Sequence, residues 1–191
     1  MVYSRFPHLI IKSAFCLVAL SALVATSTAT TANGDGCRVL TQRFPTKVFY
    51  PSSDVYEYEN AEFWSNTQLL DPACIFRPSS AKDVSDGIGI LDATSGKFAT
   101  RWGGHMGIKG ANNIDDGILM AMSNLTHCQY NLTVGGARLG PVGVPGILLA
   151  GGINFYGNQF GFSADQVTRY EVVLANGNIV EATKKKNADL F

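Results

Sequence analysis

The feature that most constrains this chain is residues 98–105, which read Phe-Ala-Thr-Arg-Trp-Gly-Gly-His. The short apolar start predicts a β-strand, and the two glycines predict a tight loop with no side chains to block its backbone N–H groups. Consecutive free N–H groups form a concavity that binds anions. We therefore expect a strand that leads into an anion-binding loop, with the His105 imidazole at its mouth. The alternative from the residues alone is a loop histidine that hydrogen-bonds a carbonyl.

A β-α-β unit is predicted just before this loop. Residues 74–77 form a brief apolar strand that is stopped by Pro78. Ser79 and Ser80 predict the start of a helix, because serine side chains accept hydrogen bonds from the first helical N–H groups. The helix is expected to end at Gly96. In such a unit ligands bind at the carboxyl ends of the strands, and the glycine loop lies at that edge.

The rest of the chain contains shorter patterns of apolar periodicity and turn residues. They predict an extended lead-in over 33–54, a short helix over 54–64, a strand over 118–122 entered by an Asp116-Gly117 turn, a compact apolar helix or turn over 140–152, and a hairpin whose strands, 167–174 and 179–182, are joined by Asn176-Gly177.

Composition excludes several classes of protein. Lys plus Arg equal Asp plus Glu at 15 each, so charge gives no argument for a nucleic-acid partner or an acidic membrane surface. A hydrophobic content of 46% with 16% charged residues excludes a disordered chain and a coiled coil. Of the three histidines, only His105 and His127 lie beyond the first 32 residues, too few for a histidine-rich metal site. We expect no metal.

Residues 1–32 resemble a secretory signal. Arg5 and Lys12 precede an apolar run over 14–25, and small residues follow as far as Ala32. An uncleaved membrane anchor is the alternative, but Lys12 leaves the run short of the roughly 20 residues that span a bilayer. We therefore expect a secreted, extracellular protein with no membrane contact after cleavage.

Secretion favours disulfides over free thiols. Cys37 and Cys74 are the predicted pair, because their bond would tie the lead-in to the first strand of the unit. Cys128 is left over. Asn124 and Asn131 each begin an Asn-Leu-Thr glycosylation acceptor pattern. Chance occurrence in a segment rich in Thr and Asn is the alternative for both.

An ordered series of motifs resembles one protein family, the secreted fungal flavoprotein oxidases of the vanillyl-alcohol-oxidase superfamily, which includes berberine-bridge-type enzymes. The series covers nearly all of residues 37–191. Its members are Cys-Ile-Phe-Arg-Pro-Ser-Ser-Ala at 74–81, Arg-x-Gly-Gly-His-Met at 101–106, Gly-Ile-Leu at 117–119, Arg-Leu-Gly-Pro-Val-Gly-Val-Pro-Gly at 138–146 and Tyr-Glu-Val-Val-Leu-Ala-Asn-Gly at 170–177.

The resemblance implies an α+β fold, an FAD-binding domain of the PCMH type over 71–191, made of two α+β subdomains with FAD between them and preceded by a lead-in over 33–70. It implies an oxidoreductase whose flavin accepts a hydride from an alcohol-, amine- or sugar-like small molecule and is reoxidised by oxygen. The implied FAD-binding residues are Arg101, Trp102, Gly103, Gly104, His105 and Met106 in a pyrophosphate loop, with a covalent bond through His105; Gly143, Gly146, Gly151 and Gly152 in a second wall; and Ile179 at the adenine end.

The chain also departs from the family pattern. Trp102 replaces a small residue in the loop, Ala150 replaces a glycine, and Pro145 stands where some relatives have a second flavin-linking cysteine. Residues 127–133 stand where the family has a further strand and helix, and the chain stops before the substrate domain. No catalytic residue is therefore identified in this chain. The alternative function is a truncated, non-catalytic remnant that does not retain flavin.

Overall fold

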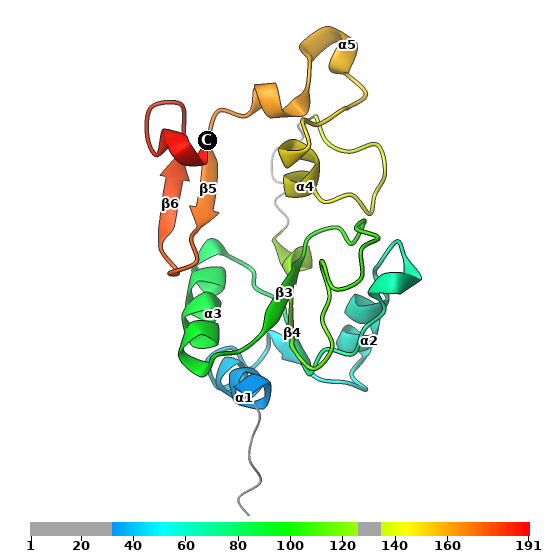
Figure 1. The fold of residues 1–191 in the computed structure, drawn as a ribbon, viewed down its shortest axis with the longest axis vertical. Helices are drawn as coiled ribbons and strands as arrows, with labels where there is room; N and C mark the ends of the chain where they lie inside the picture. The colour runs from blue at the N-terminus through cyan, green and yellow to red at the C-terminus, as the bar shows by residue number, and fades with distance from the viewer. Residues whose placement is uncertain (1–31, 126–134) are drawn as a thin grey trace, which may run out of the picture.

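The computed structural model describes residues 32–125 and 135–191 (Figure 1). Residues 1–31 of the predicted signal segment over 1–32, together with His127, Cys128 and Asn131, therefore lie outside the described residues. No helix in the described ranges is both long and apolar enough to cross a bilayer. The elements are α1 (Ala32–Arg43), β1 (Val48–Phe49), α2 (Asp54–Ala61), η1 (Asn66–Gln68), β2 (Cys74–Phe76), α3 (Ala81–Thr94), β3 (Phe98–Arg101), β4 (Ile118–Ala121), η2 (Met122–Asn124), α4 (Val144–Leu149), α5 (Gly157–Phe160), η3 (Ser163–Gln166), β5 (Tyr170–Val173), β6 (Ile179–Ala182) and η4 (Ala188–Leu190).

A four-stranded sheet with the order β1-β2-β4-β3 forms the centre of the first region. The strands β2, β4 and β3 run parallel, and β1 pairs antiparallel with β2. The predicted β-α-β unit is present as β2, α3 and β3, but β4 lies between its two strands. All four residues of β4 are buried, whereas β3 is partly exposed. The more apolar strand therefore takes the central place, where both of its faces are covered.

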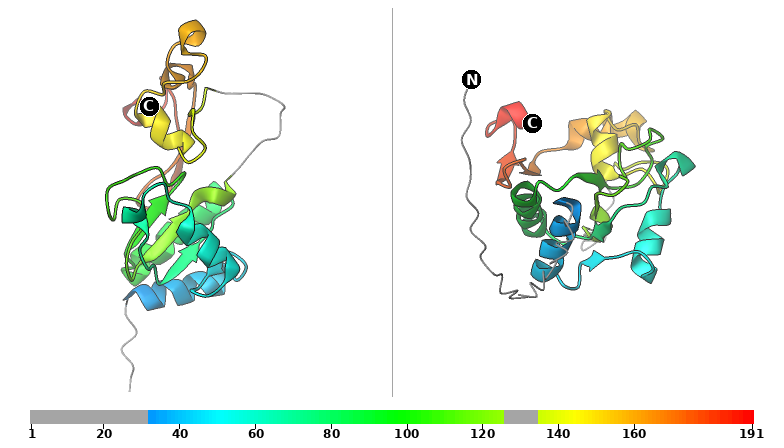
Figure 2. Two further views of the ribbon diagram at one scale, coloured as in Figure 1. Left: turned by 90° about the vertical axis from the view of Figure 1, so that its right-hand side faces the viewer. Right: turned by 60° about the horizontal axis from the view of Figure 1, so that its bottom comes forward.

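Alternate residues of the buried strands face two separate cores. Cys74, Phe76, Ile118 and Met120 pack with residues of α1 and α3, while Ile75 and Leu119 pack with Tyr56 of α2. This alternation is the two-residue period of a strand with helices on both faces. Figure 2 shows α1 and α3 on one side of the sheet and α2 on the other.

The predicted extended lead-in over 33–54 is wrong, because its first part forms α1. Cys37 and Leu40 of this helix, with Phe44 just after it, recur at helical spacing and are buried against the sheet. The glycines of this segment favoured irregular structure over a helix. In the folded protein Gly36 permits the close approach of the helix to the sheet, because a Cβ there would lie 2.8 Å from Ile118 Cδ1. The predicted Cys37–Cys74 disulfide is present and joins α1 to β2.

The helix α3 begins as the serines predict. The Ser80 side chain accepts a hydrogen bond from the Asp83 N–H, 3.1 Å away. The left-handed residue after the helix is Ser95, with φ of 52°, and the N–H of the predicted stop, Gly96, donates to the Leu91 carbonyl at 2.9 Å. The short helix predicted over 54–64 is α2, and it starts at a second serine cap, Ser53.

Residues 135–191 form a looser region beyond the carboxyl end of the sheet (Figures 1 and 2). The predicted hairpin is β5 and β6, joined at Asn176-Gly177, where Gly177 has φ of 80°. The first strand is shorter than predicted, because residues 167–169 are irregular and β5 begins only at Tyr170. The hairpin packs on α3, and a Cβ on Gly177 would lie 3.2 Å from the Ser85 carbonyl oxygen.

Candidate functional site

The glycine loop follows β3 directly at the carboxyl end of the parallel strands, as predicted. Arg101 is the last residue of β3, and Trp102 to Met106 continue from it. Ser123 follows the neighbouring strand β4 at the same edge. Ligands bind at this edge of a parallel sheet, because loops from adjacent strands meet there.

Both glycines of the loop are required by their surroundings. A Cβ on Gly103 would lie 2.2 Å from Gly143 N and 2.3 Å from the Pro141 carbonyl oxygen. Gly104 has φ of 75°, and a Cβ there would lie 2.4 Å from the Glu62 carbonyl oxygen. The backbone before α4 therefore touches one side of the loop, and the backbone after α2 touches the other. Only glycine can occupy either position.

The segment after α2 holds the loop through Trp64. The Trp64 N–H donates a hydrogen bond to the Gly104 carbonyl at 3.0 Å. The Trp64 indole also contacts the His105 ring, with ring centroids 4.9 Å apart. The His105 Nδ1 atom is buried and has no hydrogen-bond partner among the described residues. This nitrogen therefore does not have the carbonyl partner that the alternative interpretation of a loop histidine requires.

A buried ion pair lies beneath the loop. Glu59 of α2 is fully buried and pairs with Arg101, whose side chain is 3% exposed. Arg101 Nη1 donates to the Glu59 carbonyl and also to the Glu62 carbonyl. Burial lowers the pKa of the Arg101 guanidinium below its ordinary value, and the Glu59 carboxylate opposes that shift. Arg101 thus directs its donors toward α2.

Two further groups complete the partners of Glu59. The Ser123 hydroxyl donates to Glu59 Oε1 at 2.7 Å. Arg77 Nε lies 2.9 Å from the same oxygen, but not in hydrogen-bond geometry, so this contact is an ion pair only. Arg77 and Arg101 also lie over the rings of Phe49 and Phe63, at 6.0 and 5.1 Å. These contacts support both cations in a position with little water.

A cavity of about 330 Å³ opens beside the loop. Trp102 and Gly103 line it from the loop, Tyr58 from α2, Glu62 from the residue after α2, and Pro141 from the segment before α4. Trp102 is 45% exposed. An exposed indole next to backbone N–H groups suits a ligand with both a planar ring and an anionic group.

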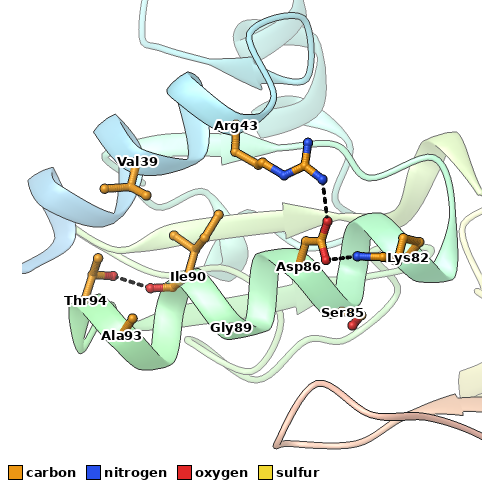
Figure 3. A pocket seen from close by; sticks show the side chains of 9 residues that line it. All are labelled: Val39, Arg43, Lys82, Ser85, Asp86, Gly89, Ile90, Ala93 and Thr94. Atoms are coloured by element: carbon orange, nitrogen blue, oxygen red, sulfur yellow. Dashed lines mark hydrogen bonds and ion pairs between the residues drawn. The ribbon is translucent and has the colours of Figure 1, made fainter.

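A larger groove, of about 510 Å³, lies elsewhere, between α1 and α3 (Figure 3). Its charged side chains are already paired, since Arg43 and Lys82 both contact Asp86. It contains no residue of the glycine loop and lies on the helical face rather than at the strand ends. We therefore place the candidate site at the smaller cavity.

The other predicted cofactor residues are distributed more widely. Gly143 touches Trp102 and Gly103, whereas Gly146 lies within α4 and a Cβ there would meet open space. Met106 is 46% exposed at the end of the loop. Gly151 and Gly152 follow α4 with φ of 93° and 83°. Ile179 begins β6, in the hairpin that packs on α3. The structure thus brings Gly143 to the loop, and Ile179 belongs to a different part of the molecule.

Sequence reasoning missed Glu59, Trp64 and Ser123. Glu59 lies in a short helix with acidic neighbours, a pattern typical of a solvated face. One signal was available: an arginine that ends an apolar strand needs a buried anionic partner, because an unpaired buried charge is costly. The sequence contained that requirement but did not show which carboxylate meets it.

Comparison with known proteins identifies fungal relatives. No protein-family model matches the sequence. The FAD-dependent monooxygenase prx3 of Penicillium roqueforti is 36% identical over 183 aligned positions, which cover 82% of this chain and 36% of the relative. The FAD-dependent monooxygenase AOL_s00215g279 of Arthrobotrys oligospora is 39% identical over 185 positions, covering 81% of this chain and 35% of that protein.

The chain therefore spans about a third of the length of these curated relatives. The alignment with the Penicillium roqueforti relative has 183 positions, which is more than the number of residues in 82% of this 191-residue chain. The relative therefore has residues within the matched region that this chain lacks.

Solved structures confirm the fold that the resemblance implies. BBE-like 1 of Physcomitrella patens matches with a TM-score of 0.69 at 20% identity, covering 81% of this chain and 39% of that one. Glucooligosaccharide oxidase of Acremonium strictum, described with a 6-S-cysteinyl, 8α-N1-histidyl FAD, matches with a TM-score of 0.68 at 20% identity, covering 82% and 38%. At this identity the likeness concerns the fold, which is the α+β fold of the FAD-binding part of such oxidases.

Proposed function

Because this chain belongs to the fungal FAD-linked oxidoreductases, we propose that it is the FAD-binding part of a secreted oxidoreductase. When bound, FAD would accept a hydride from an alcohol-, amine- or sugar-like substrate and pass electrons to oxygen. The chain spans 36% of the Penicillium roqueforti relative. We assign no catalytic residue within this chain.

The observation that carries the proposal is the loop over residues 103–105. Gly104 has the left-handed conformation that turns backbone N–H groups toward one side, and His105 has a buried nitrogen without a hydrogen-bond partner among the described residues. A pyrophosphate suits the first feature and a covalent bond to flavin suits the second. The residues present at the loop therefore fit FAD.

The role of each group in this proposal follows from its place. The N–H groups of residues 102–105 would bind the pyrophosphate, and His105 Nδ1 would form the covalent bond. The segment from Gly143 to Gly152 would be the second wall, and Ile179 would reach the adenine end through its backbone. Pro145 cannot form a thioether, so we expect at most one covalent link. Trp102 would lie over a planar part of the cofactor.

The test is covalent retention of flavin by the full chain, secreted from a fungal host. After denaturation and removal of free flavin, the purified polypeptide should keep flavin absorbance. His105→Ala should abolish that absorbance. His127→Ala, which changes the other histidine downstream of the signal segment, is the matched control and should retain it. A wild-type polypeptide that is coloured before denaturation and colourless after it contradicts the covalent link through His105, and one that is colourless before denaturation contradicts FAD binding.

A second function is favoured by one observation: Gly103 and Gly143 are in direct backbone contact. This contact leaves no gap between the two walls at that point. The chain would then be a non-catalytic remnant that keeps the loop without holding flavin. Residues that the Penicillium roqueforti relative has and this chain lacks also support this alternative. The same experiment separates the two functions, since the remnant is colourless before denaturation.

Secretion and glycosylation are part of the same proposal. Asn124 lies at the exposed end of η2, where a glycosylation enzyme can reach it. The secreted chain should lose mass after glycosidase treatment, and Asn124→Gln and Asn131→Gln should each remove one glycan. No loss of mass in wild-type protein would mean that both acceptor patterns are chance occurrences.

A further inference from the structure

We infer that Glu59 is a positioning residue for the proposed flavin loop: its buried carboxylate holds Arg101 and, through Arg101, sets where residues 102–105 lie. The inference rests on the proposed function for its connection to FAD. It makes a separate claim about the flavin-free protein, namely that the conformation of the loop depends on Glu59.

The carboxyl ends of all three parallel strands converge on Glu59. Arg77 directly follows β2, Arg101 ends β3, and Ser123 follows β4 through Met122. Each of the three contacts the Glu59 carboxylate. A single side chain from α2 therefore cross-links the edge of the sheet at which ligands of this fold class bind.

The place of Arg101 is dictated by this carboxylate. Both side chains are almost completely buried, at 3% and 0% exposure. A buried guanidinium without its partner costs several kcal/mol, so Arg101 cannot keep its position if Glu59 loses its charge. Trp102 and Gly103 are the next residues in the chain and would move with it.

Arg101 is therefore assigned a supporting role rather than direct contact with the cofactor. Its Nη2 donates to the Glu59 carboxylate, and its Nη1 donates to the Glu59 and Glu62 carbonyls. The carboxylates of Glu59 and Glu62 both act on the Arg101 guanidinium, so the charge of Arg101 is already compensated within the protein. Anion binding at the loop would therefore come from its backbone N–H groups rather than from the Arg101 side chain.

The end of α2 holds the loop at a second point. Phe63, which directly precedes Trp64 and comes four residues after Glu59, lies under the Arg101 guanidinium. Trp64 then donates its N–H to the Gly104 carbonyl. The side chain of Glu59 and the backbone of Trp64 thus fix the two ends of the same short segment, Arg101 and Gly104.

The two tryptophans of the chain make this inference measurable. Trp64 contacts His105 and Trp102 lies within the loop, so all tryptophan emission comes from the candidate site. The experiment uses the full secreted chain, with Glu59→Gln as the neutral isosteric variant. Val84→Ala, in the core between α3 and the sheet, is a control that destabilises the protein away from the loop.

Below the unfolding temperature of each protein, Glu59→Gln should change the emission maximum of flavin-free protein and its quenching by acrylamide. Val84→Ala should leave both unchanged. The FAD retained per polypeptide should fall about ten-fold in Glu59→Gln but not in the control, because the loop would no longer be held in its binding position. Equal emission and equal FAD content in the two variants would overturn the inference.

The outcomes separate the inference from the proposed function. If wild-type protein holds no FAD, the proposed function fails, and the emission comparison alone decides the role of Glu59. If Glu59→Gln does not fold, Glu59→Asp replaces it, because the shorter side chain keeps the charge but withdraws it from Arg101. Wild-type emission from Glu59→Asp together with wild-type FAD content would then overturn the inference.

Discussion

The two described regions of this chain differ in what their apolar side chains do. Residues 32–125 bury nearly all of the described core, on both faces of the four-stranded sheet. In residues 135–191, the buried positions are Gly152, Ser163 and Ala182. Large apolar side chains of that region are exposed, including Leu149 at 87% and Phe155 at 76%. The first region is therefore stabilised by its own packing.

Because of this difference, the two walls of the candidate site lie in regions of unequal stability. Burial of apolar area contributes about 25 cal/mol per Å², so the first region contains most of this contribution. The glycine loop and its Glu59 support belong to that region. The second wall, which begins at Gly143, belongs to the region with little burial. Large apolar side chains over 144–162, among them Leu149, Phe155 and Phe160, are exposed.

The largest expected difference between the regions comes from replacing one leucine with alanine in each of them. Leu40→Ala should destabilise the protein by about 3 kcal/mol, because it leaves a cavity at a fully buried site. Leu149→Ala should change stability by less than about 0.5 kcal/mol, since that side chain is exposed. Denaturant unfolding midpoints measure both. Equal losses would mean that the two regions pack alike.

Loss of the disulfide should have an effect of similar size. Replacing both Cys37 and Cys74 with alanine opens a cross-link between residues separated by 37 positions and should lower the free energy of unfolding by about 3 kcal/mol. Urea unfolding with and without reductant measures the loss. Cys128→Ala removes one thiol without opening this bond and should leave the reductant effect in place.

The residues that cap the helices should contribute differently to stability in the two regions, by a smaller amount. Ser80→Ala should cost about 1 kcal/mol, because it removes the acceptor for the Asp83 N–H. Ser80→Thr should retain most of the stability. In contrast, Gly143 precedes α4 without a side-chain cap, and Gly143→Ser should add nothing because a Cβ there would lie 2.7 Å from Trp102 Cβ. Thermal unfolding compares the three variants.

The smallest effect depends on pH and belongs to the first region. Burial alone would raise the pKa of Asp83, but hydrogen bonds from Lys47 and Ser79 lower it below its ordinary value of 3.8. A carboxylate with a lowered folded pKa stabilises the protein above the unfolded value, and this stability is lost as pH falls through the folded pKa. Thermal unfolding from neutral pH to below 3.8 should show a loss of less than about 1 kcal/mol. Asp83→Asn should flatten that part of the profile.

Much of the first region could be predicted because its signals are local. The run Cys-Ile-Phe before Pro78 is β2, and the serines after it start α3. The loop after β3 lies at the predicted edge. The lead-in was predicted incorrectly because Gly36 reads as a helix breaker in isolation. In the folded protein the same glycine lets α1 approach Ile118, which the sequence does not show.

By itself, the sequence determined the strand, the glycine pair and the histidine after it, because apolar runs and glycines act through local sterics and burial. It also determined the Cys37–Cys74 pair and the family of the chain. Only the tertiary structure decided that Arg101 turns toward Glu59, that Trp64 holds Gly104, and that Gly143 closes on Gly103. Each of these contacts joins residues 40 or more positions apart, and a buried charge or a backbone carbonyl takes whichever partner the fold brings within reach.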